Sequence, residues 1–196
     1  FSPFLEATGE KAERPPEEFI GLVVSGGHTS LYEVKAGETS TLAETRDDAM
    51  GEVFDKVGKR LGLPYPQGPL VDQLAEIGDG ERFPLPVARC SDGSLDFSYS
   101  GLKSQTLVEI QRLESAGVET YLGDTREREV PREVVDLLAG FRRAAVGQLV
   151  DRLARLLEQR PFRQLAVSGG VAANRLLRPS LEAWAENNDV DLRLVA

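Results

Sequence analysis

The sequence contains very little cysteine and histidine. Cys90 is the single cysteine and His28 the single histidine among 196 residues. One cysteine excludes an internal disulfide and fits a reducing compartment. One histidine cannot form a transition-metal site alone, because such metals need several converging ligands. The sequence therefore predicts neither a disulfide-stabilised fold nor a metal centre built from its own residues.

Long apolar runs and an excess of basic charge are also absent. No stretch reaches the roughly eighteen apolar residues of a membrane-spanning helix, and the first residues lack the pattern of a signal peptide. The net charge is −9, whereas tight binding of nucleic acid needs clustered Lys and Arg. We therefore expect a cytoplasmic protein without membrane contact. The hydrophobic content of 41% is sufficient for a core.

A glycine turn near the beginning of the chain is the first functional signal. The strand-like run 19–24 ends in Ser25, Gly26 and Gly27, and a second strand-like run follows at 31–35. Tandem glycines let a ligand approach the main chain closely, and consecutive backbone N–H groups can form a concave anion site. A plain hairpin turn is the alternative, since Gly-Gly is also a hairpin signal.

A second turn of the same kind makes the ligand-binding interpretation stronger. Ser168, Gly169 and Gly170 follow a hydrophobic strand, and helical spacing of apolar residues begins at Ala172. Backbone N–H groups at such a helix start would point at a ligand. Two such turns suggest the two walls of one nucleotide cleft. Actin-like ATPase and sugar-kinase folds are built in this way. This likeness implies an α/β fold of the actin-like ATPase type: three layers, with helices on both faces of a mixed sheet.

Hydrophobic periodicity predicts the remaining elements. The expected strands span 19–24, 31–35, 41–45, 95–98, 162–167 and 192–196. The expected helices span 47–61, 70–77, 102–113, 132–159 and 176–186. The final strand–helix–strand order implies a parallel pair with a right-handed crossover. Residues 62–69 are expected to form a rigid loop, because they contain three prolines and two glycines.

Charged residues on these helices have competing interpretations. One face of the helix expected at 47–61 carries Asp48, Glu52 and Asp55. The simpler interpretation is a solvated face with ion pairs along the helix. Asp72 is placed in the first turn of its helix, where a carboxylate suits the helix dipole. The long helix carries arginines opposite its apolar stripe, which predicts a solvated face or, alternatively, a tRNA or partner surface. These arginines are Arg142, Arg143, Arg152, Arg155 and Arg160.

Three further segments are more specific than the glycine turns. They are residues 47–56, 61–69 and 95–103. Together with the two turns, and in this order, they resemble the TsaD family of tRNA threonylcarbamoyladenosine transferases, formerly described as O-sialoglycoprotein endopeptidases. The resemblance runs from Ser2 to the C-terminal end, and 98–101 looks bacterial. Gln67 departs from the pattern, because the family usually has a glycine there.

The resemblance implies transfer of a threonylcarbamoyl group from threonylcarbamoyl-adenylate to the exocyclic amine of an adenosine beside the tRNA anticodon. Ionised Asp55 and Asp72 are acceptors suited to ribose hydroxyls, and Asn174 can both donate to and accept from a nucleoside. Lys103 is either a surface lysine or close to the substrate. No general base is assigned. The expected substrate-binding residues are Val23, Val24, Ser25, Gly26, Gly27, Asp55, Gly68, Asp72 and Asn174.

The resemblance also implies a divalent metal, iron or zinc, with ligands before Phe1 and after Ala196. The chain is therefore expected to be a fragment that does not catalyse transfer alone. Its expected partners are tRNA, a related actin-like protein and an ATPase of the same pathway. We expect residues 1–18 to be a loop segment. Residues 19–196 are expected to form a partial actin-like second domain with a helical insertion at about 62–130.

Two other functions remain open from the residues alone. The chain could belong to another actin-like ATPase or kinase, although 62–69 and 95–103 match no kinase motif that we recognise. It could also be a nucleotide-binding scaffold domain in which the glycine turns are structural. Adenylate binding would favour either enzyme class over a purely structural role.

Overall fold

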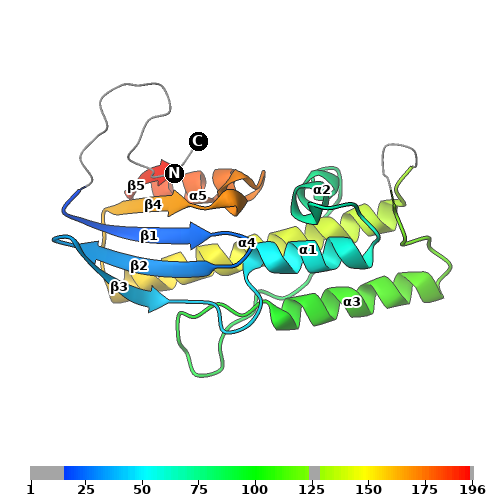
Figure 1. The fold of residues 1–196 in the computed structure, drawn as a ribbon, viewed down its shortest axis with the longest axis horizontal. Coiled ribbons are helices and arrows are strands. Elements are labelled where there is room, and N and C mark those ends of the chain that lie inside the picture. The colour runs from blue at the N-terminus through cyan, green and yellow to red at the C-terminus, as the bar shows by residue number, and fades with distance from the viewer. Residues whose placement is uncertain (1–15, 124–128, 195–196) are drawn as a thin grey trace.

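The computed structural model describes residues 16–123 and 129–194, which form a mixed five-stranded sheet and the helices around it (Figure 1). The strands are β1 (Glu18–Val24), β2 (Thr29–Lys35), β3 (Glu38–Ala43), β4 (Gln164–Ser168) and β5 (Asp191–Leu194). Their order is β3-β2-β1-β4-β5. β1 pairs antiparallel with β2 and parallel with β4. β2 pairs antiparallel with β3, and β4 pairs parallel with β5. The parallel pair predicted at the end of the chain is therefore confirmed.

Strand β1 lies between these two halves of the sheet. Ile20, Leu22 and Val24 are buried, while the residues between them are only partly covered. This alternation follows the two-residue period of a strand and places one face of β1 against the hydrophobic core. Val23 is paired with Ser30 of β2 and with Ser168 of β4. Both predicted glycine turns therefore begin at the same end of the sheet, where the neighbouring parallel strands β1 and β4 finish.

The helices lie partly beyond the end of β1 and partly along the sheet (Figure 1). They are α1 (Met50–Arg60), α2 (Gln67–Ala75), α3 (Ser100–Ser115), α4 (Arg132–Gln159) and α5 (Leu177–Asn187), with a short 3-10 helix, η1 (Gly170–Ala173). In Figure 1, α1, α2 and α3 lie beyond the end of β1, and α4 extends from this group along the sheet. Phe54 of α1 packs on Phe141 of α4, with ring centroids 4.7 Å apart.

Helix α4 has the predicted bounds, but its arginines do not form the predicted solvated face. Arg152 is fully buried and Arg142 is 8% exposed. Arg152 donates to the backbone oxygens of Asp96 and Ala88 at 3.0 and 3.1 Å. The solvated-face prediction is wrong for both arginines, because backbone carbonyls supply the acceptors that water would otherwise provide. These carbonyls belong to loop residues for Arg152 and to helix α2 for Arg142. Arg143, between them in the sequence, does remain partly exposed.

Two other elements differ from prediction. The strand expected at 95–98 is reduced to one isolated bridge between Thr45 and Phe97. Helix α2 begins at Gln67, three residues earlier than expected, because a proline within the first helical turn costs no hydrogen bond there. The segment expected at 1–18 lies outside the described residues up to residue 15. The division into a domain with an insertion at about 62–130 stays a prediction.

No helix in the described ranges is both long enough and apolar enough to cross a membrane.

Candidate functional site

The first glycine turn closes through Ser25. The Ser25 backbone N–H donates to the His28 backbone oxygen at 2.8 Å. Its hydroxyl oxygen accepts from the backbone N–H groups of Gly27 and His28 at 3.3 and 3.0 Å. Ser25 therefore shapes the turn itself.

The start of α1 docks directly on this turn. The Gly51 N–H donates to the Ser25 oxygen at 3.2 Å, and the Met50 N–H donates to Thr29 Oγ1 at 2.9 Å. A Cβ atom on Gly51 would lie 2.7 Å from the Ser25 oxygen and 2.8 Å from the Gly26 Cα. Only glycine permits this approach, so Gly51 fixes α1 against the turn.

The second glycine turn lies beside the first. Gly169 has a φ of +104°, and a Cβ there would lie 2.2 Å from the Val24 oxygen. The main chain after β4 therefore packs against the end of β1. Chain direction changes through η1, and Asn174 separates η1 from α5. The helical spacing seen from Ala172 onward is thus divided between a 3-10 turn and α5, which begins one residue after the helix predicted at 176–186.

Asp55 and Gly68 are brought together by the packing of α1 on α2. The Gly68 N–H donates to Asp55 Oδ1 at 2.7 Å. Gly68 lies in the first turn of α2, where N–H groups have no partner within the helix. Asp55 therefore supplies an acceptor from a neighbouring helix, and one of its oxygens is already engaged.

Asp72 and Asn174 also meet, although they are far apart in the sequence. Asn174 Nδ2 donates to Asp72 Oδ1 at 2.8 Å, and the Arg175 N–H donates to Asp72 Oδ2 at 3.0 Å. Asp72 is 6% exposed and Asn174 is 7% exposed. Asn174 Oδ1 accepts from the N–H groups of Leu176 and Leu177 at 3.0 and 2.9 Å, so it caps α5.

Asp72 does not have the position in its helix that the sequence suggested. Because α2 spans Gln67–Ala75, Asp72 is in its second turn and near its C-terminal end. A carboxylate gains nothing from the helix dipole there. Its environment is instead the side chain of Arg142, whose Nη1 donates to Asp72 Oδ1 at 3.1 Å. The dipole explanation is therefore wrong.

Sequence reasoning missed the role of Asp47. Its carboxylate accepts from the hydroxyls of Ser98 and Ser100 at 2.5 and 2.7 Å, and from the N–H groups of Tyr99 and Ser100 at 2.8 and 3.2 Å. Partial burial by itself would raise the pKa of Asp47, but these hydrogen bonds outweigh it and lower the pKa. Asp47 thus caps α3 from outside. The only sequence signal was its place in a motif segment.

The neighbouring Asp48 holds two lysines. Its carboxylate is 2.5 Å from Lys56 Nζ and 2.5 Å from Lys103 Nζ. Burial alone would raise the pKa of Asp48, but the two ammonium groups lower it. Lys56 also pairs with Glu52 at 2.8 Å, as its i+4 spacing predicted. Lys103 is therefore not a simple surface lysine, since it ties α3 to the start of α1.

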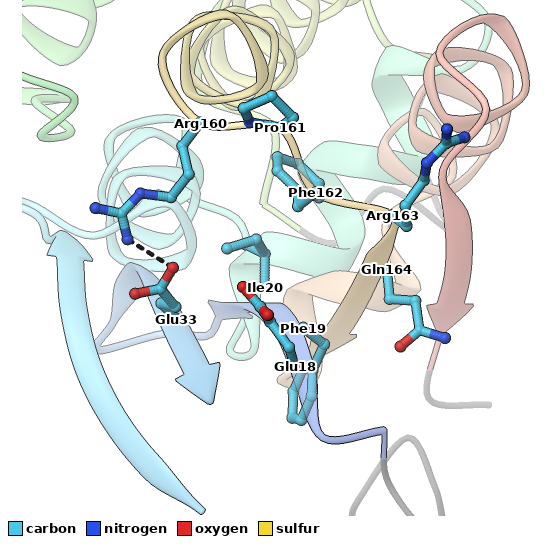
Figure 2. Close-up of a pocket in the computed structure, with 9 residues that line it drawn as sticks. All are labelled: Glu18, Phe19, Ile20, Glu33, Arg160, Pro161, Phe162, Arg163 and Gln164. Carbon is cyan, nitrogen blue, oxygen red and sulfur yellow. Dashed lines mark ion pairs between the residues drawn. The ribbon is translucent and has the colours of Figure 1, made fainter. Parts of the chain in front are cut away.

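The cavity in Figure 2 lies at the opposite end of the sheet from the glycine turns. It has a volume of about 240 Å³. It is lined at the first residues of β1 and the segment before β4, with Arg160 pairing with Glu33 at 2.6 Å across its rim. None of the predicted site residues lines it.

The described residues do not supply a metal site. Within 16–123 and 129–194, no group of three or more His, Cys, Asp and Glu side chains could hold an ion. The histidine available, His28, is exposed in the first glycine turn. These residues do not fit a divalent metal, and no chemical step is assigned to one.

The sheet order and the glycine turns place the chain in the class of actin-like ATPase folds. It is similar to the crystal structure of T. kodakarensis HypF, with a TM-score of 0.66 and 13% identity over 94% of this chain and 32% of that chain. A second match is full-length HypF in its phosphate- and nucleotide-bound form, with a TM-score of 0.61 and 12% identity over 92% of this chain and 37% of that chain. Likeness at this identity shows the fold alone, and the predicted fold class is confirmed.

Sequence comparison identifies the family within that class. The family "TsaD: tRNA N6-adenosine threonylcarbamoyltransferase" matches residues 3–196, and the chain belongs to this family. The transferase of that name from Burkholderia vietnamiensis is 46% identical over 91% of this chain and 50% of its own length. The one from Burkholderia ambifaria is 44% identical over 92% and 50%. The chain thus spans about half the length of these relatives.

Proposed function

We propose that this chain forms the adenylate-binding part of a tRNA N6-adenosine threonylcarbamoyltransferase. Family membership supports the reaction class. The two adjacent glycine turns support the position of the ligand. The proposed ligand is threonylcarbamoyl-adenylate or a related adenine nucleotide, with its phosphate against the turns at the ends of β1 and β4.

The observation that carries this proposal is unused space at three glycines. A Cβ atom on Gly26, Gly27 or Gly170 would meet nothing within 4 Å, and none of the three has a φ in the left-handed range. The fold itself therefore does not require glycine at these positions. A ligand approaching the backbone would require it, because a side chain would occupy the same space. Gly51 and Gly169, by contrast, are explained by packing.

The polar residues around the turns would hold the rest of the adenylate. We place Asp55 and Asp72 at the ribose, since each carboxylate retains acceptor capacity beyond the contacts described above. Asn174 uses one N–H of its amide on Asp72, which leaves a second for the nucleoside. Gly68 contributes close backbone approach beside Asp55. Val23, Val24 and Ser25 would set the position of the first turn.

The proposed reaction is acyl transfer. The exocyclic amine of the tRNA adenosine attacks the carbamoyl carbon, and a C–N bond forms. The bond from that carbon to the adenylate phosphate oxygen breaks, so AMP leaves with the electron pair and the amine loses a proton. Within this scheme the described residues bind and orient the adenylate. None of them is assigned as the general base.

The remaining components are proposals from the family. The divalent metal, iron or zinc, would take its ligands from outside the described residues. The substrate tRNA, a related actin-like protein and an ATPase of the same pathway would be the partners. The cytoplasm would be the compartment, where tRNA modification takes place.

The test uses the protein in its full length. Incubation with threonylcarbamoyl-adenylate, tRNA and the partner proteins, followed by mass spectrometry of the nucleosides, should show the modified adenosine. The 196-residue chain alone should give no modification under the same conditions. ATP hydrolysis without any modified adenosine would instead favour a different actin-like ATPase activity.

A further inference from the structure

Arg142 occupies an unusual position for an arginine on a long helix. It is 8% exposed, and its guanidinium lies between α4 and the C-terminal end of α2. Nη1 donates to both Asp72 Oδ1 and the Asp72 backbone oxygen at 3.1 Å, and Nη2 donates to the Ala75 oxygen at 3.1 Å. Taking a guanidinium out of water is costly unless such partners are present.

Three connected side chains link the helical part of the molecule to the second glycine turn. Arg142 holds Asp72, Asp72 accepts from Asn174 at 2.8 Å, and Asp72 also accepts from the Arg175 N–H at 3.0 Å. Asn174 in turn caps the start of α5. We call Arg142, Asp72 and Asn174 the buried clasp.

We propose that Arg142 is a positioning residue for the adenylate site. It fixes the carboxylate of Asp72, and through it the orientation of Asn174 and of the main chain after the second glycine turn. This inference rests on the proposed function, because it assigns Arg142 a role toward the ligand that Asp72 and Asn174 would contact. Arg142 does not itself touch the ligand in this account.

The chemistry of arginine suits this role better than that of lysine. The guanidinium is planar and has five donors in a fixed fork, so it can hold a carboxylate and two helix-end carbonyls together. A lysine at 142 would retain the charge, but its three donors share one nitrogen and do not match the spread of the three acceptors. A methionine would retain the packing volume and leave the Asp72 carboxylate buried without its cation.

The experiment compares Arg142→Met, Arg142→Lys and two controls in the full-length protein. Arg152→Met removes another buried arginine of α4 that contacts different carbonyls. Arg143→Met removes the neighbouring arginine, which is partly exposed and pairs with Glu81. Calorimetry measures the Kd for AMP, denaturation measures stability, and hydrogen exchange follows the N–H groups of residues 175–177.

We expect Arg142→Met to weaken AMP binding by about ten-fold or more, because displacing Asp72 and Asn174 would remove about one hydrogen bond to the ligand. Exchange at 175–177 should accelerate in the same variant. Arg142→Lys should give a smaller loss, and Arg143→Met should leave the Kd unchanged. Arg152→Met should lower stability without affecting exchange at 175–177.

Two results would overturn the inference while the proposed function stands. An unchanged Kd in Arg142→Met would show that the clasp does not position the ligand. An equal loss of affinity in Arg142→Met and Arg152→Met would show a general loss of stability instead. If the unaltered protein binds no adenylate, the proposed function fails, and the role of Arg142 toward the ligand fails with it.

Discussion

At the scale of single residues, Gly51 and Gly169 are required by the fold, whereas Gly26, Gly27 and Gly170 are not. The first pair has backbone oxygens within 2.7 Å of an added Cβ, while the others have nothing within 4 Å. Glycines that look equivalent in the sequence therefore serve different purposes. Gly51 and Gly169 allow two main-chain segments to pack closely, whereas Gly26, Gly27 and Gly170 leave the backbone uncovered by any side chain.

We expect Gly51→Ala to destabilise the protein. The added methyl group would push the start of α1 away from Ser25, and such overpacking typically costs about 1–3 kcal/mol, more than the roughly 1 kcal/mol that alanine gains over glycine in a helix. Chemical denaturation gives the free energy of unfolding. Gly101→Ala in α3 is the control, because its methyl group has open space and should be neutral or stabilising. Equal effects in both variants would contradict the packing argument.

Asn174 gives a second test at this scale. Asn174→Ala removes the cap of α5 and the contact with Asp72, so we expect a loss of about 1–3 kcal/mol in stability and a weaker affinity for AMP in the full-length protein. Asn188→Ala, at the other end of α5, removes only a bond to the Trp184 oxygen and should cost less. Unchanged calorimetric affinity in Asn174→Ala would argue against contact with the nucleoside.

The sequence identified the residues of the clasp more readily than their contacts. Asp72 and Asn174 were named through the family resemblance, but the hydrogen bond between their side chains joins positions 102 residues apart. Arg142 was assigned to a solvated face, because helical periodicity places charges away from the apolar stripe. The carbonyls that receive its donors belong to another helix and are invisible to a local pattern.

At the scale of elements, Asp47 joins two helices by capping α3 from the loop before α1. We expect Asp47→Asn to loosen the start of α3, which would appear as faster exchange of its first N–H groups. The fold lowers the pKa of Asp47 below its unfolded value of 3.8. The ionised carboxylate therefore stabilises the folded protein fully above that pH, and this stabilisation is lost as the pH falls through the lower, folded pKa.

The corresponding measurement is urea denaturation of the wild type and of Asp47→Asn, at neutral pH and at about pH 3. The difference in unfolding free energy between wild type and Asp47→Asn should narrow at the lower pH. A difference that stays constant with pH would show that the ionised carboxylate is not the stabilising form.

Elements with strong periodicity were predictable, and those defined by distant contacts were not. Helix α4 has the predicted bounds because its buried positions recur over its whole length. Helix α2 was placed too late, because Gly68 and Pro69 are typical of loops. The residues at 95–98 have strand-like composition, but beyond the single bridge to Thr45 they serve to lead into α3 and its cap.

At the scale of the whole molecule, the sheet places both glycine turns at the same end of its strands. Helices then contact the two turns separately. Gly51 of α1 contacts the first turn, and the buried clasp reaches the main chain after the second. The site is thus assembled from residues near both ends of the chain. The strand order that brings them together could be predicted only through the resemblance to actin-like folds.

The most direct test of the account is calorimetric titration of Gly26→Ala and Gly27→Ala in the full-length protein with threonylcarbamoyl-adenylate or AMP. The account predicts wild-type stability, because the added methyl groups have open space in the fold. It also predicts an affinity weaker by about ten-fold or more, because the same space would hold the ligand phosphate. Unchanged affinity together with unchanged stability would contradict the proposed position of the adenylate.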